Sequence, residues 1–157
     1  MRTPDIPKRL PDIVIVTGTP GTGKTTIAKK LARKHNLDYI DVNDIVKEHK
    51  LSEGYDRKRK TRIVDEKKLA KILESIIKQA RKERRRLIID SHMSHCIDPK
   101  LVDLCIVTRT SLRKLANRLK RKGYHKAKIE ENLECEIMDI ILEEAKHAGH
   151  KVKVVET

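Results

Sequence analysis

The stretch of the chain best suited to chemistry is residues 18–25, GTPGTGKT, which follows a run of β-branched residues and precedes a basic helical pattern. Its glycines allow the backbone to fold so that successive N–H groups point inward at one anion. A helix that starts at Lys24 would add the positive end of its dipole to the same place. The spacing G-x-x-x-x-G-K-T therefore predicts a loop that binds the phosphates of a nucleoside triphosphate.

Each residue type in this loop has an expected task. We expect Gly18, Gly21 and Gly23 to give the backbone the shape of a cradle. The Lys24 ammonium should neutralise the β- and γ-phosphates, and the Thr25 hydroxyl should be a ligand of Mg²⁺. The expected cofactor is therefore Mg²⁺, with ATP as the substrate.

The apolar pattern predicts the elements that position this loop. A buried strand is expected over 12–17 and a helix over 25–36, on either side of the loop. The other expected strands are 39–42, 86–90, 101–109 and 150–157, and the other helices are one that starts at 65, one capped by Ser111, and one that runs from Ile129 to Ile141. Residues 43–64 are predicted to be a polar interruption, with a turn at 53–56.

Strands that alternate with helices favour a parallel sheet with helices on both faces. We therefore predict an α/β domain of the P-loop type, with a five-stranded parallel sheet, over the whole of 1–157. Residues 1–11 contain three prolines and three basic residues and are expected to form a flexible leader.

The composition narrows the class of protein further. The net charge of +14 favours anionic partners such as nucleotides, RNA or acidic proteins. Only 2% of the residues are aromatic, which argues against reading single-stranded nucleic acid by base stacking. Three scattered cysteines argue against a disulfide framework or a four-cysteine zinc site. No apolar run has the length of a membrane span, so we expect a cytoplasmic protein without a membrane partner.

Among proteins with such a loop, the short chain favours a nucleoside monophosphate kinase. A GTPase would need a guanine-reading N-K-x-D sequence, which is absent, and a motor ATPase usually has a larger domain. Kinases of this class insert an acceptor-binding segment after the second strand and a lid after the fourth. The basic interruptions at 43–64 and 121–131 fall at those two places.

Nine blocks of sequence together resemble the adenylate kinase isoenzyme six family of archaea and eukaryotes. The resemblance covers about residues 12 to 146, nearly without gaps. In chain order the blocks are TGTPGTGKTT, YIDVNDIVKE, EGYD, DEKKL, IIDSH, IVTRT, RLKRKGY, NLECEI and EEA. Members of this family are kinases tied to maturation of the small ribosomal subunit, and the resemblance implies ATP, ADP and AMP as nucleotides, with a ribosomal protein and pre-ribosomal RNA as further partners.

The resemblance also implies roles for individual residues. By this resemblance Thr26 belongs to the triphosphate-binding loop. The monophosphate-binding segment would be residues 41–64, and the lid would be residues 121–131. Asp90 matches a carboxylate that serves Mg²⁺ or its water shell, and His92 would orient a water for ATP hydrolysis. The remaining residues that the resemblance implicates are Arg118, expected to stack on adenine, Lys122, expected at the phosphates, and the acceptor-side residues Asp44, Lys47, Gly54 and Tyr55.

The same residues have plainer interpretations. Asp90 could cap the loop that follows it, and His92 could be hydrogen-bonded locally. Arg118 could be a solvated helix charge, and 54–56 could be only a turn. Two positions also depart from the family pattern, because lysine replaces arginine at Lys122 and Lys47 and so loses the forked contact with phosphate.

The sequence therefore predicts reversible transfer of the ATP γ-phosphate to AMP, accompanied by ATPase activity. An ATPase switch for ribosome assembly, with incidental kinase turnover, remains the alternative from another class of function. A metabolite kinase would fit the loop but not the later blocks.

Overall fold

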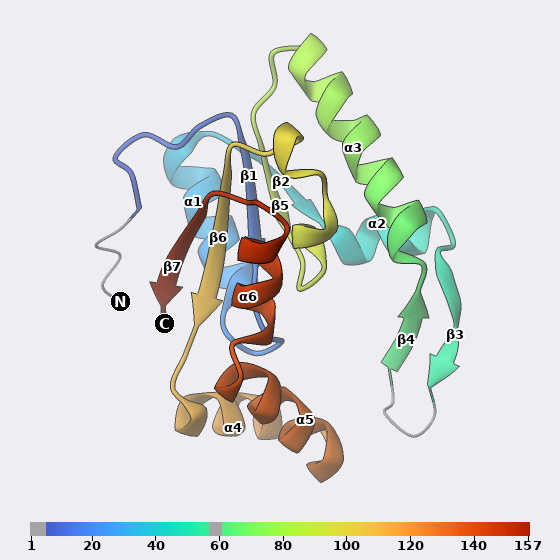
Figure 1. Cartoon of the computed structure of the whole chain (residues 1–157), viewed down its shortest axis with the longest axis vertical. Coiled ribbons are helices and arrows are strands. Elements are labelled where there is room, and N and C mark those ends of the chain that lie inside the picture. The colour runs from blue at the N-terminus through green and yellow to red at the C-terminus, as the bar shows by residue number, and fades with distance from the viewer. Residues whose placement is uncertain (1–5, 57–60) are drawn as a thin grey trace.

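The computed structural model describes residues 6–56 and 61–157, without the side chains of 53, 55, 56 and 61–63 (Figure 1). Strands and helices alternate along most of the chain. In chain order they are β1 (Ile13–Thr17), α1 (Lys24–His35), β2 (Asp38–Asp41), α2 (Val42–Glu48), β3 (Ser52–Asp56), β4 (Thr61–Val64), α3 (Glu66–Lys82), β5 (Leu87–Asp90), the short 3₁₀ helices η1 (Ser94–Cys96) and η2 (Pro99–Leu101), β6 (Leu104–Arg109), α4 (Leu112–Arg121), α5 (Lys126–Ile137), α6 (Ile140–His147) and β7 (Val152–Glu156).

Five of the strands form one parallel sheet in the order β2-β5-β1-β6-β7, which confirms the predicted sheet. Strands β1 and β5 are buried along their whole length, as expected for central strands covered on both faces. The register pairs Val16 with Asp90 and Thr17 with Val107. The carboxyl ends of β1, β5 and β6 therefore meet at one edge of the sheet, next to the glycine-rich loop.

Two apolar cores lie on opposite faces of this sheet. One packs α2, α3 and α6 against the sheet, and the other packs the apolar stripe of α1 against its reverse side (Figure 1). A third, smaller cluster joins α4 to α5 beyond the carboxyl ends of the strands, with Leu115, Leu119 and Ile129 at its centre. The segment after β6 therefore has a small core of its own.

Two of the predicted helix starts are confirmed by their capping contacts. The Asp65 carboxylate accepts hydrogen bonds from the backbone N–H groups of Lys67 and Lys68 at the start of α3. The Ser111 hydroxyl accepts a hydrogen bond from Lys114 N at the start of α4. In both helices a short polar side chain satisfies N–H groups that have no partner within the helix.

Three expectations are corrected by the structure. The interruption at 43–64 contains α2 and an antiparallel hairpin, β3–β4, so that the expected turn at 53–56 lies within a strand. The single helix expected from Ile129 to Ile141 is two helices, because Asp139 adopts the left-handed conformation between them. Leu10, expected in a flexible leader, is buried against the core that contains α1.

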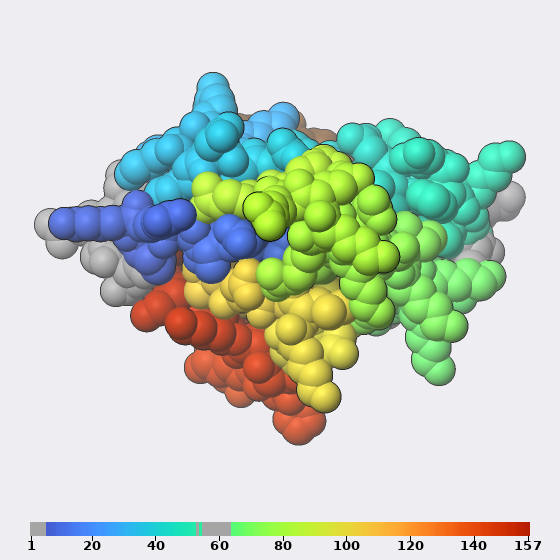
Figure 2. Space-filling model, turned by 90° about the horizontal axis from the view of Figure 1, so that it is seen from above, coloured from blue at the N-terminus to red at the C-terminus, as the bar shows by residue number. Residues whose placement is uncertain are grey.

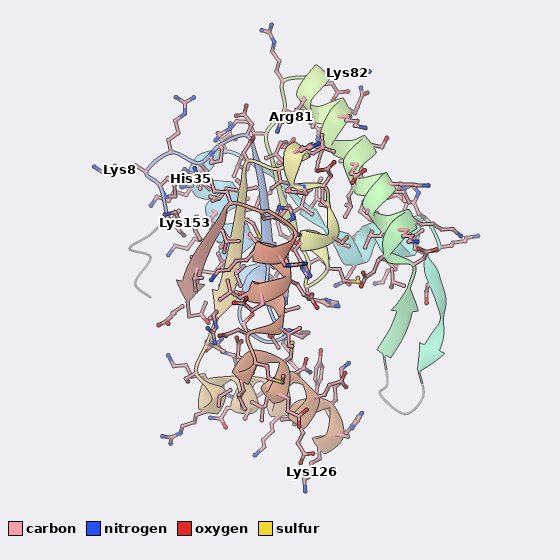
Figure 3. All side chains as sticks on the ribbon, in the orientation of Figure 1. Lys8, His35, Arg81, Lys82, Lys126 and Lys153 are labelled. Carbon is pink, nitrogen blue, oxygen red and sulfur yellow. The ribbon has the colours of Figure 1, made fainter. Side chains whose placement is uncertain are left out.

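Figure 2 views the molecule from the end that carries the amino ends of the strands, where the segment before β1 (blue) lies beside the end of α3 and the segment that follows it (yellow-green). Arg86 connects segments there, donating to His35 O and Leu10 O at 2.6 Å each and contacting Asp12. Figure 3 shows His35 and Arg81 at this end and Lys126, on α5, at the opposite end.

None of the described helices is long and apolar enough to cross a membrane.

Candidate functional site

The glycine-rich loop is fastened to β6 by close backbone and hydroxyl contacts. A Cβ atom on Gly18 would lie 2.5 Å from Thr108 Oγ1, so that only glycine fits there without displacement. The Thr22 hydroxyl donates to Thr19 O at 2.6 Å and lies 2.7 Å from Thr108 Oγ1. The loop is therefore held in one shape by protein contacts.

The end of the loop leads directly into α1. Gly23 precedes the helix with φ 90°, in the left-handed region that favours glycine, and α1 has no side-chain cap. The first N–H groups of α1 therefore remain available to an anion, and the helix dipole favours negative charge at this end. This geometry agrees with the phosphate-binding role expected for the loop.

Lys24 is the first residue of α1 and points back along the loop, with Nζ 3.4 Å from Thr19 O. Burial lowers the pKa of Lys24 to about 8, and the positive charge of Lys122 adds to this effect, whereas Asp90 opposes it. An ammonium group with this pKa is poorly solvated. Phosphate oxygens would supply the negative charge and hydrogen bonds that it lacks.

Asp90 ends β5 beside the loop and is only 4% exposed. Its Oδ2 accepts two hydrogen bonds of 2.7 Å, from Thr25 Oγ1 and from Tyr39 Oη. Thr25 and Asp90, which were expected at the metal, are therefore in direct contact.

The chemistry of these oxygens fits Mg²⁺. Mg²⁺ prefers hard oxygen ligands and is usually held by one or two carboxylates together with phosphates and water, rather than by a protein cage. Among the described residues, no group of three or more His, Cys, Asp or Glu side chains could hold a metal ion. The pair of Thr25 and Asp90 fits a metal that the nucleotide brings with it.

His92 follows β5, and its surroundings keep the imidazole neutral at physiological pH. Burial of the ring lowers the pKa of His92 to about 4, with further lowering by the positive charge of Lys24. The residue as a whole is nevertheless exposed to solvent. A neutral ring in contact with solvent can accept or donate a hydrogen bond to water.

These residues line a pocket of about 270 Å³ at the carboxyl edge of the sheet. Its walls come from four segments: the glycine-rich loop, the junction of β2 and α2, the end of β5 with the residues after it, and the segment from the end of α4 into the first turn of α5. The lining residues are Pro20, Gly21, Lys24, Thr25, Asp41, Asn43, Asp90, Ser91, His92, Lys122, Tyr124 and Lys128.

Several residues expected at the site do not line this pocket. Thr26 is exposed in the first turn of α1. Arg118 lies beside the loop, where its Nη1 donates to Gly21 O at 3.3 Å and to Thr157 Oγ1 at 3.0 Å. Asp44 and Lys47 are exposed on α2.

The remaining acceptor-side residues lie in the hairpin. Gly54 is in β3, and no described atom would lie within 4 Å of a Cβ added to it. The side chain of Tyr55 falls outside the described part of the chain.

Sequence reasoning gave no role to Tyr39, Asn43 or Tyr124, although Asn43 and Tyr124 line the pocket and Tyr39 binds Asp90. The contact of Tyr39 with Asp90 follows from the register of β2 and β5. These strands pair so that Asp41, two residues after Tyr39, lies opposite Asp90. Lys128, which lies within the segment 121–131 expected to be the lid, lines the same pocket.

Comparison with known proteins places the chain among nucleotide kinases. The family model described as an AAA domain matches residues 14–139. An adenylate kinase isoenzyme 6 homolog of Schizosaccharomyces pombe is 44% identical over 149 residues, which cover 95% of this chain and 82% of that protein. The Saccharomyces cerevisiae homolog FAP7 is 39% identical and covers 91% and 71% of the two chains. A protein of the archaeon Saccharolobus solfataricus, provisionally named as an adenylate kinase, is 42% identical and covers 92% and 73%.

Solved structures support the fold at lower identity. A sugar kinase from Janibacter sp. has a TM-score of 0.57 at 15% identity and covers 91% of this chain and 83% of its own. The deoxyadenosine kinase of M. mycoides with bound dATP has a TM-score of 0.54 at 15% identity, with coverage of 92% and 90%. These similarities confirm the P-loop α/β fold.

Proposed function

Because the chain belongs to the family of adenylate kinase isoenzyme 6 homologs, we propose that it transfers the γ-phosphate of ATP reversibly to AMP. The pocket at the carboxyl edge of the sheet carries this proposal. It combines a phosphate cradle, a Thr25–Asp90 pair suited to Mg²⁺, and cations from a separate helical segment. Ligands of parallel α/β sheets bind at this edge.

In this proposal the protein acts mainly by positioning and by neutralising charge. The loop N–H groups and Lys24 hold the β- and γ-phosphates, and Lys122 and Lys128 add positive charge to the pocket wall. Bound Mg²⁺, held by Thr25 and Asp90, would neutralise charge on the same phosphates. No side chain needs to become phosphorylated.

We place the acceptor nucleotide on the side of the pocket formed by β2 and α2. Asp41 and Asn43 line the pocket there, and Asp41 Oδ1 accepts a hydrogen bond from Asn43 N that fixes the start of α2. The segment 41–64, including the residues expected from the family pattern, would hold AMP. The segment 121–131 would be the lid, and both assignments remain proposals.

ATP hydrolysis is a second activity that we propose for the same pocket, because a neutral His92 lies in it. Hydrolysis requires a water positioned at the γ-phosphate, and a neutral imidazole can hold one. A role in assembly of the small ribosomal subunit, through a ribosomal protein and pre-ribosomal RNA, would use this hydrolytic activity. The net charge of +14 supports contact with RNA.

Product analysis tests the two activities on one preparation. The protein is incubated with Mg²⁺·ATP, with and without AMP, and ADP and free phosphate are quantified. Kinase action gives two ADP for each AMP consumed, without free phosphate. Formation of ADP and free phosphate that does not depend on AMP would identify an ATPase, and absence of ADP in both reactions would contradict the proposal.

A further inference from the structure

The Tyr39 hydroxyl reaches the carboxylate of Asp90 from a neighbouring strand. Strands β2 and β5 are parallel, and their register places Tyr39 beside Ile88 and Asp41 beside Asp90. Tyr39 is therefore two residues before the position opposite Asp90 and on the same face of the sheet, a diagonal that a long aromatic side chain can span. Its Oη donates to Asp90 Oδ2 at 2.7 Å.

The tyrosine ring is held by contacts that do not involve the pocket. It packs against the apolar core beneath α1, and Lys29 Nζ of α1 lies 5.5 Å from the ring centroid. A ring with two rotatable bonds that is covered in this way directs its hydroxyl with little loss of entropy. The hydroxyl is therefore in place before any nucleotide binds.

Both hydroxyl donors bind the same one of the two carboxylate oxygens of Asp90. Thr25 and Tyr39 both donate to Oδ2, and Oδ1 accepts no hydrogen bond from the described residues. Two donors on one oxygen restrict rotation of the carboxylate about its last bond. The second oxygen then remains available to a metal ion or to its water ligands.

Tyr39 keeps its proton in this environment. Burial and the hydrogen bond to Asp90 raise the pKa of Tyr39 above its usual value near 10. The hydroxyl is consequently a donor throughout the physiological range. It cannot become an anion that would compete with Asp90 for a cation.

We propose that Tyr39 is a positioning residue whose hydroxyl orients the Asp90 carboxylate toward the metal of the bound nucleotide. This inference rests on the proposed function, in which Asp90 serves Mg²⁺. It adds Tyr39, from within the edge strand β2, to a site to which this strand otherwise contributes only its last residue, Asp41.

The test compares the wild type with Tyr39→Phe, which removes the hydroxyl and keeps the ring. Binding of ADP is measured by titration calorimetry with saturating Mg²⁺ and again with a chelator, so that no turnover is needed. We expect the gain in affinity that Mg²⁺ provides to fall roughly tenfold in the variant. A hydrogen bond to a charged group contributes a free energy that corresponds to a factor of this size. Affinity for ADP without metal should be unchanged.

A double-mutant cycle with Asp90→Asn shows whether the effect passes through the carboxylate. In that background Tyr39→Phe should cause no further loss of the metal-dependent gain. Equal weakening of ADP binding with and without Mg²⁺, or no change in either, would overturn the proposal. Because these measurements need no AMP, absence of kinase activity would contradict the proposed function without deciding the role of Tyr39.

Discussion

Arg109 at the end of β6 binds Glu136 near the end of α5, with Nε 3.1 Å from Oε1 and Nη2 3.3 Å from the backbone carbonyl of the same residue. The Glu136 side chain is 5% exposed, and burial raises its pKa even though Arg109 opposes the shift. Arg109 also contacts Asp139, where α5 gives way to α6. One arginine therefore ties the junction of α5 and α6 to the end of β6.

Replacing Arg109 with Met should destabilise the protein, because Glu136 would be left buried without its charge partner. We expect the free energy of unfolding to fall by about 2 kcal/mol. This loss is smaller than the loss on breaking a fully buried ion pair, because Arg109 is partly exposed. Denaturant unfolding at pH 7 measures this loss. The matched control is Arg85→Met, which breaks the exposed pair with Asp38 and should change stability far less, because solvent screens that pair.

Replacing Lys24 with Ala should abolish both phosphoryl transfer and ATP hydrolysis, because the variant loses the charge at the β- and γ-phosphates. The fold should persist, since the Lys24 side chain makes only a long hydrogen bond to Thr19 O among the described contacts. Initial rates and a thermal melt on one preparation check both points. Retention of more than about a tenth of the transfer rate, a barrier change below roughly 1.4 kcal/mol, would remove Lys24 from the mechanism.

Replacing His92 with Gly should depress ATP hydrolysis much more than phosphorylation of AMP. Transfer to AMP needs no side chain to orient a water, whereas hydrolysis does. Asp90→Ala should depress both activities, because both need the metal. The two rates are measured at saturating Mg²⁺ and fixed ionic strength, and equal losses in the His92 variant would rule out the proposed division.

Replacing Lys122 with Arg should tighten ATP binding or speed transfer. Lys122 lines the pocket, and a guanidinium can contact phosphate with two parallel hydrogen bonds where an ammonium offers a single point charge. Steady-state kinetics give KM and kcat for ATP. Unchanged values for both would mean that Lys122 does not contact phosphate in the closed state.

Acid should destabilise the protein partly through His150. Burial lowers the pKa of His150, whose Nε2 lies 2.8 Å from His95 O and whose Nδ1 is buried without a partner among the described residues. Because the unfolded chain binds the proton more readily, the stability from neutral His150 is complete above about pH 6.5 and is lost as pH falls below it. His150→Gln should therefore reduce the slope of unfolding free energy between about pH 7 and pH 5. The exposed His147→Gln is the control, and identical slopes for wild type and His150→Gln would contradict this role.

The parts of the site that sequence could predict are those with short-range signals. Gly18, Gly23 and Lys24 lie within eight residues, and their spacing alone dictates a phosphate loop and a helix start. The contact between Tyr39 and Asp90 depends instead on the strand order β2-β5-β1, which places residues far apart in sequence side by side. No local sequence pattern indicates this strand order.

The helix α2 and the break between α5 and α6 were missed because their local sequence signals are weak. In α2, seven residues long, only Val42 and Val46 are buried, which is too little to show a helical period. The break between α5 and α6 falls at Asp139, in the left-handed conformation, without a glycine or proline to announce it. The contacts of Arg109 with both sides of the break hold this conformation, and they exist only in the folded protein.

Gly21 is the point at which the phosphate loop contacts α4. A Cβ atom there would lie 2.8 Å from Leu115 Cδ1 and 2.9 Å from Leu119 Cδ2, and its φ of 93° is in the region that favours glycine. The loop and α4 are therefore packed directly against each other, although Gly21 and Leu115 are 94 positions apart in sequence. A chimera that imported α4 from a relative would have to bring leucines of matching size to these two positions. Helix α4 is for that reason not interchangeable with the equivalent helix of a relative.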